Sequence, residues 1–123
     1  GACGNTCDFR PADTQNFTAL LAEFRSQLNA IDPHLMLTIA APAGEPRFSK
    51  IELRKIHKYL DYISLMTYDF HGTWDSMTNY HANLFTSNKD PNPPENRFSV
   101  NDTVLAYRLR GVPGNKLLIG IPF

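Results

Sequence analysis

The sequence predicts an α/β protein that forms part of a (β/α)8 or TIM barrel, and three observations favour this fold. Apolar runs and amphipathic segments alternate in the order helix, strand, helix, strand, loop, helix, strand. This order is typical of right-handed βαβ units in a parallel sheet. No glycine-rich phosphate turn follows any of the strands, which argues against a nucleotide-binding doubly wound fold. The 123 residues suffice for about half of a barrel, so we expect residues 1–123 to be a fragment of one domain in a longer protein.

The composition excludes several other classes of protein. Hydrophobic residues make up 42% of the chain, and its 12 basic residues balance its 12 acidic residues. A nucleic-acid partner is therefore not expected, because such proteins carry a basic excess. No apolar run approaches the ~20 residues that a membrane-spanning helix needs. The apolar content also argues against a disordered chain.

The first helix is expected to begin at Asp13, as its N-terminal cap, and to end at Asp32, which precedes a proline. Its apolar residues recur at helical spacing and form one stripe: Phe17, Leu20, Leu21, Phe24 and Leu28. The next run, 35–41, is apolar without alternation, which is typical of a parallel strand covered on both faces. We therefore expect this strand to lie inside a layered α/β core.

The second helix and strand come after a short loop that contains Pro42 and Pro46. Ser49 and Glu52 have the spacing of a capping box, which predicts a helix running to about Leu60. The apolar run 62–68 then predicts a second buried strand. These two elements complete one βαβ unit.

Residues 70–98 contain many asparagines, prolines and aromatic residues without a regular period. Long loops of this kind in compact domains are commonly functional or disordered. A second capping box, at Ser99 and Asp102, predicts a helix that stops at Gly111. The apolar run 116–121 predicts the third strand.

The end of the second strand carries the clearest functional signal. Active sites of parallel barrels lie where the strands end and the loops begin. Here the phenol of Tyr68 and the carboxylate of Asp69 stand at a strand end, and Trp74 comes five residues later. Carboxylates bind sugar hydroxyls and aromatic faces stack on sugar rings, so this group suits a carbohydrate site. The alternative is that Tyr68 is a buried packing residue and Asp69 a helix cap.

Other residue types give weaker signals. Cys3 and Cys7 can form a small surface disulfide, remain free thiols or supply half of a metal site. His71 and His81 lie in the long loop, but their spacing does not define a metal site. No serine-hydrolase elbow motif is present.

The segment Leu65-Met66-Thr67-Tyr68-Asp69-Phe70-His71-Gly72 resembles the sixth-strand motif of family 18 glycoside hydrolases, the chitinases. The stretch from Trp74-Asp75 to Leu84-Phe85 is similar to the segment after this motif in bacterial members. Residues 37–41 and 116–123 resemble the fifth and seventh strands, and Gly1 resembles the residue just after the family's D-x-x-D-x-D-x-E motif. The resemblance therefore implies strands five to seven of the barrel.

The resemblance also implies a function for the parent protein. It would be a secreted chitinase that cuts β-1,4 bonds between N-acetylglucosamine units by a retaining, substrate-assisted mechanism. It would need no cofactor or metal, and its partners would be chitin or N-acetylglucosamine oligosaccharides rather than nucleic acid or a membrane. The general-acid Glu would lie upstream of this chain. Lectin-like relatives without that Glu, and endo-β-N-acetylglucosaminidases, are the alternatives within the family.

The resemblance assigns a role to five residues of this sequence. Tyr68 matches the tyrosine that hydrogen-bonds the substrate acetamido group, and Asp69 matches the aspartate that contacts the same sugar. Met66 matches the floor of that subsite, and Ala40 matches a small residue that leaves room there. Trp74 matches an aromatic platform on the leaving-group side, so we expect its ring to be more exposed than is usual for tryptophan.

Overall fold

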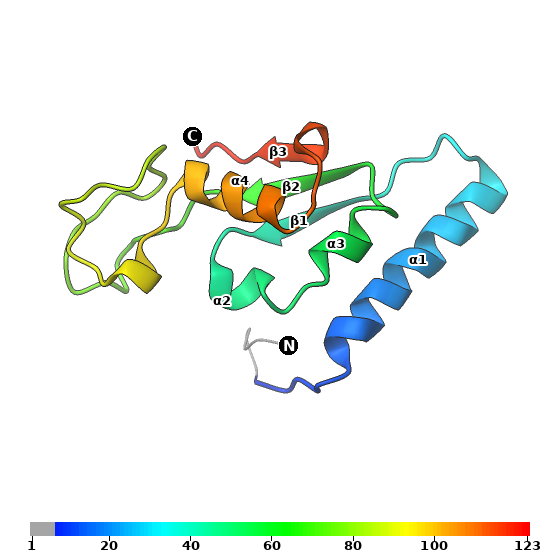
Figure 1. Cartoon of the computed structure of the whole chain (residues 1–123), viewed down its shortest axis with the longest axis horizontal. Helices are drawn as coiled ribbons and strands as arrows, with labels where there is room; N and C mark the ends of the chain where they lie inside the picture. The colour runs from blue at the N-terminus through cyan, green and yellow to red at the C-terminus, as the bar shows by residue number, and fades with distance from the viewer. Residues whose placement is uncertain (1–6) are drawn as a thin grey trace.

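The computed structural model describes residues 7–123, apart from the side chain of Glu95, and the chain forms one parallel sheet with helices (Figure 1). The strands occur in the spatial order β1-β2-β3 and alternate with the helices along the chain. The elements are α1 (Asp13–Ile31), β1 (Thr38–Pro42), α2 (Glu45–Phe48), α3 (Leu53–Ile56), β2 (Tyr62–Met66), η1 (Pro94–Asn96), α4 (Val100–Leu109), η2 (Gly114–Lys116) and β3 (Leu117–Ile119). No helix within residues 7–123 is long and apolar enough to cross a membrane.

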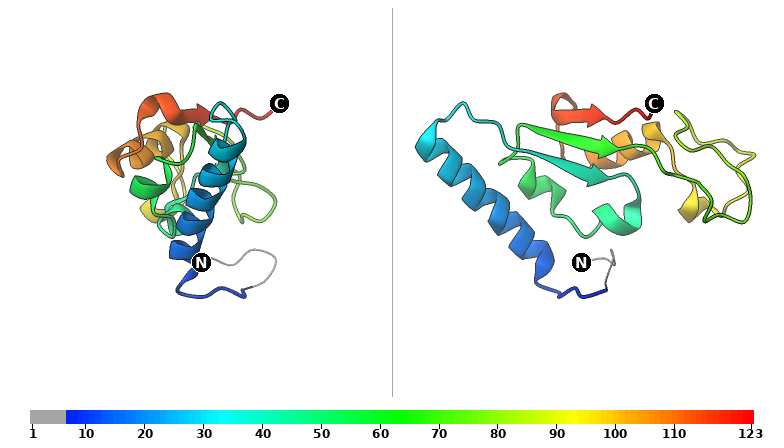
Figure 2. Two further views of the ribbon diagram at one scale, coloured as in Figure 1. Left: turned by 90° about the vertical axis from the view of Figure 1, so that its right-hand side faces the viewer. Right: turned by 180° about the vertical axis from the view of Figure 1, so that it is seen from behind.

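The strand register brings the carboxyl ends of the strands to one edge of the sheet. Ala41 pairs with Leu65, which in turn pairs with Ile119, and Pro42 pairs with Met66. Figure 2 shows the arrows of the strands pointing the same way, with residues 70–98 extending beyond their tips. The long loop is therefore placed at the functional end of the sheet, as the sequence predicts.

Helices α1 to α4 contribute to a core on one face of the sheet. Their buried side chains meet the inward-facing residues of β1 and β2 in one cluster, which includes Leu21, Ala41, Phe48, Leu53, Ile56, Ile63, Leu65 and Tyr107. The ring of Tyr107 packs edge-on against Phe48 at 5.1 Å between centroids. Its hydroxyl donates a hydrogen bond of 2.7 Å to the carbonyl of Pro42, which fixes the end of β1 to α4.

The opposite face of the sheet is open, so the expectation of strands covered on both faces is wrong for this chain. Thr38, Ala40 and Leu118 are exposed, while Ala41, Ile63 and Leu65 point into the helical core. The reason is that strand side chains alternate between the two faces, and the described residues supply no element for the second face. The exposed apolar side of the sheet is the side that faces the interior in a closed barrel.

Two of the expected helix starts differ from the structure. Ala12, not Asp13, is the N-cap of α1, and Asp13 accepts a hydrogen bond of 2.8 Å from the backbone of Arg10. The expected capping box at residues 49–52 does not form, because Ser49 ends α2. Glu52 instead accepts hydrogen bonds from Thr18 of α1 at 2.7 Å and from Lys55 at 2.6 Å. The expected helix from Ser49 to about Leu60 is therefore reduced to the short helix α3, and the short helix α2 lies before Ser49, partly within the expected loop.

The last helix starts as predicted. Ser99 is the N-cap of α4 and accepts a hydrogen bond of 3.1 Å from the backbone of Asp102. Donation from the hydroxyls of Thr86 and Ser99, with Asn101 nearby, holds the pKa of the Asp102 carboxyl below its usual value despite partial burial. Gly111 ends the helix with φ of 88°, a conformation that favours glycine.

Candidate active site

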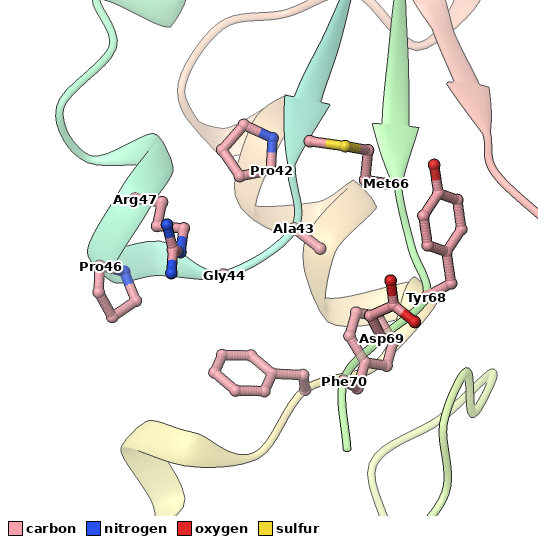
Figure 3. Close-up of a pocket in the computed structure, with 10 residues that line it drawn as sticks. Pro42, Ala43, Gly44, Pro46, Arg47, Met66, Tyr68, Asp69 and Phe70 are labelled. Atoms are coloured by element: carbon pink, nitrogen blue, oxygen red, sulfur yellow. The ribbon is translucent and has the colours of Figure 1, made fainter. Parts of the chain in front are cut away.

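A cavity of about 360 Å³ opens at the carboxyl ends of β1 and β2 (Figure 3). Its lining residues come from the β1–α2 connection, the end of β2 and the far end of the long loop: Pro42, Ala43, Gly44, Pro46, Arg47, Met66, Tyr68, Asp69, Phe70 and Phe98. Three of the five residues selected from the sequence, Met66, Tyr68 and Asp69, are therefore brought to one cavity. We call this the first cavity.

Tyr68 is held against the end of β3. A Cβ atom added to Gly120 would lie 2.7 Å from Cε1 of Tyr68, so the ring packs directly on the glycine backbone. The amide of Gly120 donates to the carbonyl of Leu65 at 2.9 Å, and the hydroxyl of Thr67 donates to the carbonyl of Gly120 at 2.8 Å. These bonds fix the surface on which the Tyr68 ring lies.

Asp69 has an uncommon backbone conformation for a residue other than glycine. Its φ is 55°, in the left-handed region. Such conformations cost about 1–3 kcal/mol and concentrate at functional sites. The side chain of Asp69 is exposed, and one carboxylate oxygen lies 3.5 Å from Nδ1 of His81. A hydrogen bond of 3.0 Å from the amide of Phe70 to the carbonyl of His81 holds the two segments together.

The other two selected residues lie outside the lining of the first cavity. Ala40 is exposed on the open face of the sheet, where it pairs with Ser64 on β2. Trp74 has an exposed fraction of 65%, which confirms that its ring is largely accessible. A Cβ atom on Gly72 would lie 2.5 Å from Cη2 of Trp74, so the ring lies over this glycine.

A buried histidine shapes the turn that carries Trp74. His71 is 5% exposed, and its Nδ1 lies 3.2 Å from a carboxylate oxygen of Asp75. The same oxygen accepts a hydrogen bond of 3.0 Å from the amide of Gly72. The His71–Asp75 pair therefore closes the turn 71–75 and presents Trp74 to solvent.

Sequence reasoning missed several residues that the fold brings to the site. Arg47, from α2, lines the first cavity, and Gly120 supports Tyr68. Phe98, which packs against Phe70 at 6.1 Å between ring centroids, closes another side. Arg47 comes soon after the end of a predicted strand, and this position was the available signal, because strand-end loops of α/β folds carry function. The contact of Gly120 with Tyr68 has no signal in the local sequence.

The two cysteines can be described only in part. Cys3 lies outside the described residues, so the expected pairing with Cys7 is not described. Cys7 itself is disulfide-bonded.

The parallel sheet, the helices that alternate with its strands and the cavity at the strand ends define part of an α/β barrel. The family model described as "Glycosyl hydrolases family 18" matches residues 3–123, and the chain belongs to this family. This confirms the resemblance noted for the sixth-strand motif and the partial (β/α)8 barrel.

Individual relatives are chitinases. The chain is 39% identical over 121 residues to "Chitinase 1" of Aphanocladium album, an alignment that takes in 91% of this chain and 28% of that protein. It superimposes on chitinase ChiA74 from Bacillus thuringiensis with a TM-score of 0.89 at 38% identity, covering 99% of this chain and 20% of that structure. It also resembles Ostrinia furnacalis Group II chitinase catalytic domain 2, with a TM-score of 0.84 at 32% identity, covering 94% of this chain and 29% of that one. The chain thus spans less than a third of the length of these relatives.

Proposed function

We propose that residues 1–123 form strands five to seven of a single (β/α)8 catalytic domain in a chitinase that hydrolyses β-1,4 bonds of chitin. The observation that carries this proposal is the meeting of Met66, Tyr68 and Asp69 in one cavity at the strand ends. The names of the related chitinases support it. The Ostrinia furnacalis structure contains a penta-N-acetyl chitooligosaccharide, which supports an N-acetylglucosamine oligomer as substrate.

In this proposal the chain positions the reacting sugar by hydrogen bonding. The hydroxyl of Tyr68 donates to the acetamido oxygen, which attacks the anomeric carbon as the internal nucleophile of a retaining mechanism. Asp69 accepts from the same sugar, and Met66 forms the floor beneath it. Ala40 leaves room on the sheet face, and Trp74 stacks on the leaving-group side. The general acid is a Glu upstream of this chain, so these residues bind and orient.

We also propose that the parent protein is secreted. Cys7 is disulfide-bonded, and disulfides persist mainly in oxidising, extracytoplasmic environments. One structural neighbour is described as part of a bacterial cell-surface-expressed enzyme machinery, which supports the same location.

The test is Tyr68→Phe in the full-length protein that contains this chain. The change removes one hydroxyl and keeps the ring on Gly120, so the fold should survive. Loss of one preorganised donor to the reacting oxygen should lower kcat for an N-acetylglucosamine oligomer by about 10²–10³-fold. Tyr62→Phe is the matched control, because Tyr62 begins β2 at the opposite end of the strand.

Two results would contradict the proposal in different ways. Near-normal turnover by Tyr68→Phe would make Tyr68 a packing residue and remove the main support for the substrate-assisted role. Binding of the oligomer without any hydrolysis by the unmodified protein would identify a non-catalytic, lectin-like relative instead.

A further inference from the structure

A second cavity lies within the long loop, apart from the lining of the first. Its volume is about 460 Å³, which is enough for a small ligand. Polar and aromatic side chains dominate its lining, chiefly Thr78, Asn79, Tyr80, Ser87, Lys89 and Asp90. We call this the second cavity. None of the roles proposed above uses it.

His81, in the long loop, connects the second cavity with the first. Asp69 lines the first cavity, and its carboxylate lies 3.5 Å from the ring of His81. The residue before His81 is Tyr80, which lines the second cavity. The two cavities are therefore connected through the contact between Asp69 and His81 and the peptide bond between Tyr80 and His81.

Asp90 shows that the second cavity is built around a fixed charge. Asp90 is only 8% exposed. Its Oδ1 accepts a hydrogen bond of 2.8 Å from Nδ2 of Asn79 and one of 2.9 Å from the backbone amide of Asn92. Burial raises the pKa of Asp90, but donation from Asn92 and Asn79, with His71 nearby, outweighs burial and lowers the pKa overall. Within residues 7–123 no group donates to Oδ2. This oxygen therefore has acceptor capacity left for a ligand hydroxyl.

The other lining groups match the chemistry of an uncharged sugar. Tyr80 has an exposed fraction of 69%, so its ring is available to stack on the apolar face of a pyranose. The hydroxyls of Thr78 and Ser87 can donate to or accept from ring hydroxyls. Lys89 and Asp90 carry opposite charges, so the cavity has no net charge that would select an anion or a cation.

We propose that the second cavity is a further subsite, which binds a neutral sugar unit of an oligosaccharide whose reacting end occupies the first cavity. This inference deepens the proposed function and rests on it for the identity of the oligosaccharide. Tyr80 supplies the stacking surface, and Asp90 with Ser87 supplies the polar contacts. The subsite adds affinity for long oligomers and leaves the contacts of short ones unchanged.

The experiment measures the dissociation constants of the N-acetylglucosamine hexamer and dimer by titration calorimetry. The full-length protein carries Tyr68→Phe as background, so that hydrolysis during the titration is slow. Adding Tyr80→Ala should raise the Kd of the hexamer about 5- to 10-fold, in line with the value of one aromatic contact. The Kd of the dimer, which is short enough for the first cavity, should stay unchanged.

Phe85→Ala is the matched control. Phe85 is similarly exposed, at 65%, belongs to the same loop and is absent from the lining of the second cavity. It should alter neither dissociation constant. An unchanged hexamer Kd in Tyr80→Ala would overturn the proposal, and so would an equal rise for hexamer and dimer. A parent protein that binds the hexamer through Tyr80 but hydrolyses nothing would refute the chitinase proposal and leave the subsite standing.

Discussion

Replacing Gly120 with alanine should damage activity through Tyr68, a residue 52 positions away in the sequence. The added Cβ would lie 2.6 Å from the carbonyl oxygen of Leu65, 2.7 Å from Cε1 of Tyr68 and 3.2 Å from its Cδ1. Non-bonded carbon atoms prefer about 3.5–4.0 Å. The carbonyl of Leu65 is held in place, because it accepts hydrogen bonds of 2.9 Å from the amides of both Gly120 and Thr67. The backbone at position 120 and the Tyr68 ring must therefore both move, the ring by on the order of 1 Å.

The size of this displacement sets the expected effects. A misplacement of about 1 Å in a positioned group can cost about 10²-fold in rate. We therefore expect kcat of the full-length protein for an N-acetylglucosamine oligomer to fall by about 10²-fold in Gly120→Ala. Overpacking should also lower the free energy of unfolding by about 1–3 kcal/mol. Gly114→Ala is the control, because its Cβ would meet only Arg108, at 3.8 Å.

A double-mutant comparison separates positioning from general damage. If Gly120 acts by holding Tyr68, then Gly120→Ala should cost little further kcat once the hydroxyl is already removed by Tyr68→Phe. Steady-state kinetics and thermal unfolding of the two single variants and the double variant measure this. A full 10²-fold additional loss in the double variant would refute the reasoning, and so would normal kcat in Gly120→Ala.

Three further outcomes are expected for the full-length protein. Trp74→Ala should weaken oligosaccharide binding by up to about tenfold. It should change the free energy of unfolding by less than about 0.5 kcal/mol, since the ring is exposed. A loss of several kcal/mol in thermal unfolding would make Trp74 a core residue. Tyr107→Phe should cost about 1–2 kcal/mol of stability, because the carbonyl of Pro42 loses its donor; an unchanged melting temperature would contradict this. The pKa of Asp102 is lower in the folded protein than in the unfolded chain, so its ionised form stabilises the fold. This contribution is complete when the pH is above the ordinary pKa of aspartate, and it is lost as the pH falls through the lowered pKa. The melting temperatures of the unmodified protein and of Asp102→Asn should therefore converge as the pH falls below about 4, and a constant difference would argue against the role of the charge.

Much of the site could be read from residues that are close in the sequence. Met66, Tyr68 and Asp69 lie within four consecutive positions at the end of a strand, so their convergence comes from the local chain alone. Met66 ends β2, and Tyr68 and Asp69 follow it at once, so one strand end brings all three to the carboxyl edge of the sheet. Arg47 and Gly120 were missed for the opposite reason. Arg47 follows β1 and Gly120 follows β3, so both reach the site through the pairing of these strands with β2, which the local sequence around Tyr68 does not encode.

The same division applies to the fold. Local sequence patterns were enough to predict the alternation of helices and parallel strands, the long loop and the start of α4 at Ser99, because apolar periodicity and capping act over a few residues. The bond of Glu52 to Thr18, in place of a helix cap, depends on how α1 packs against the rest of the chain. The position of Ala40 on an open sheet face likewise depends on packing, since exposure is set by which elements cover a strand. Contacts between distant segments determine the hydrogen bond of Glu52 and the exposure of Ala40, because their free energies outweigh local preferences.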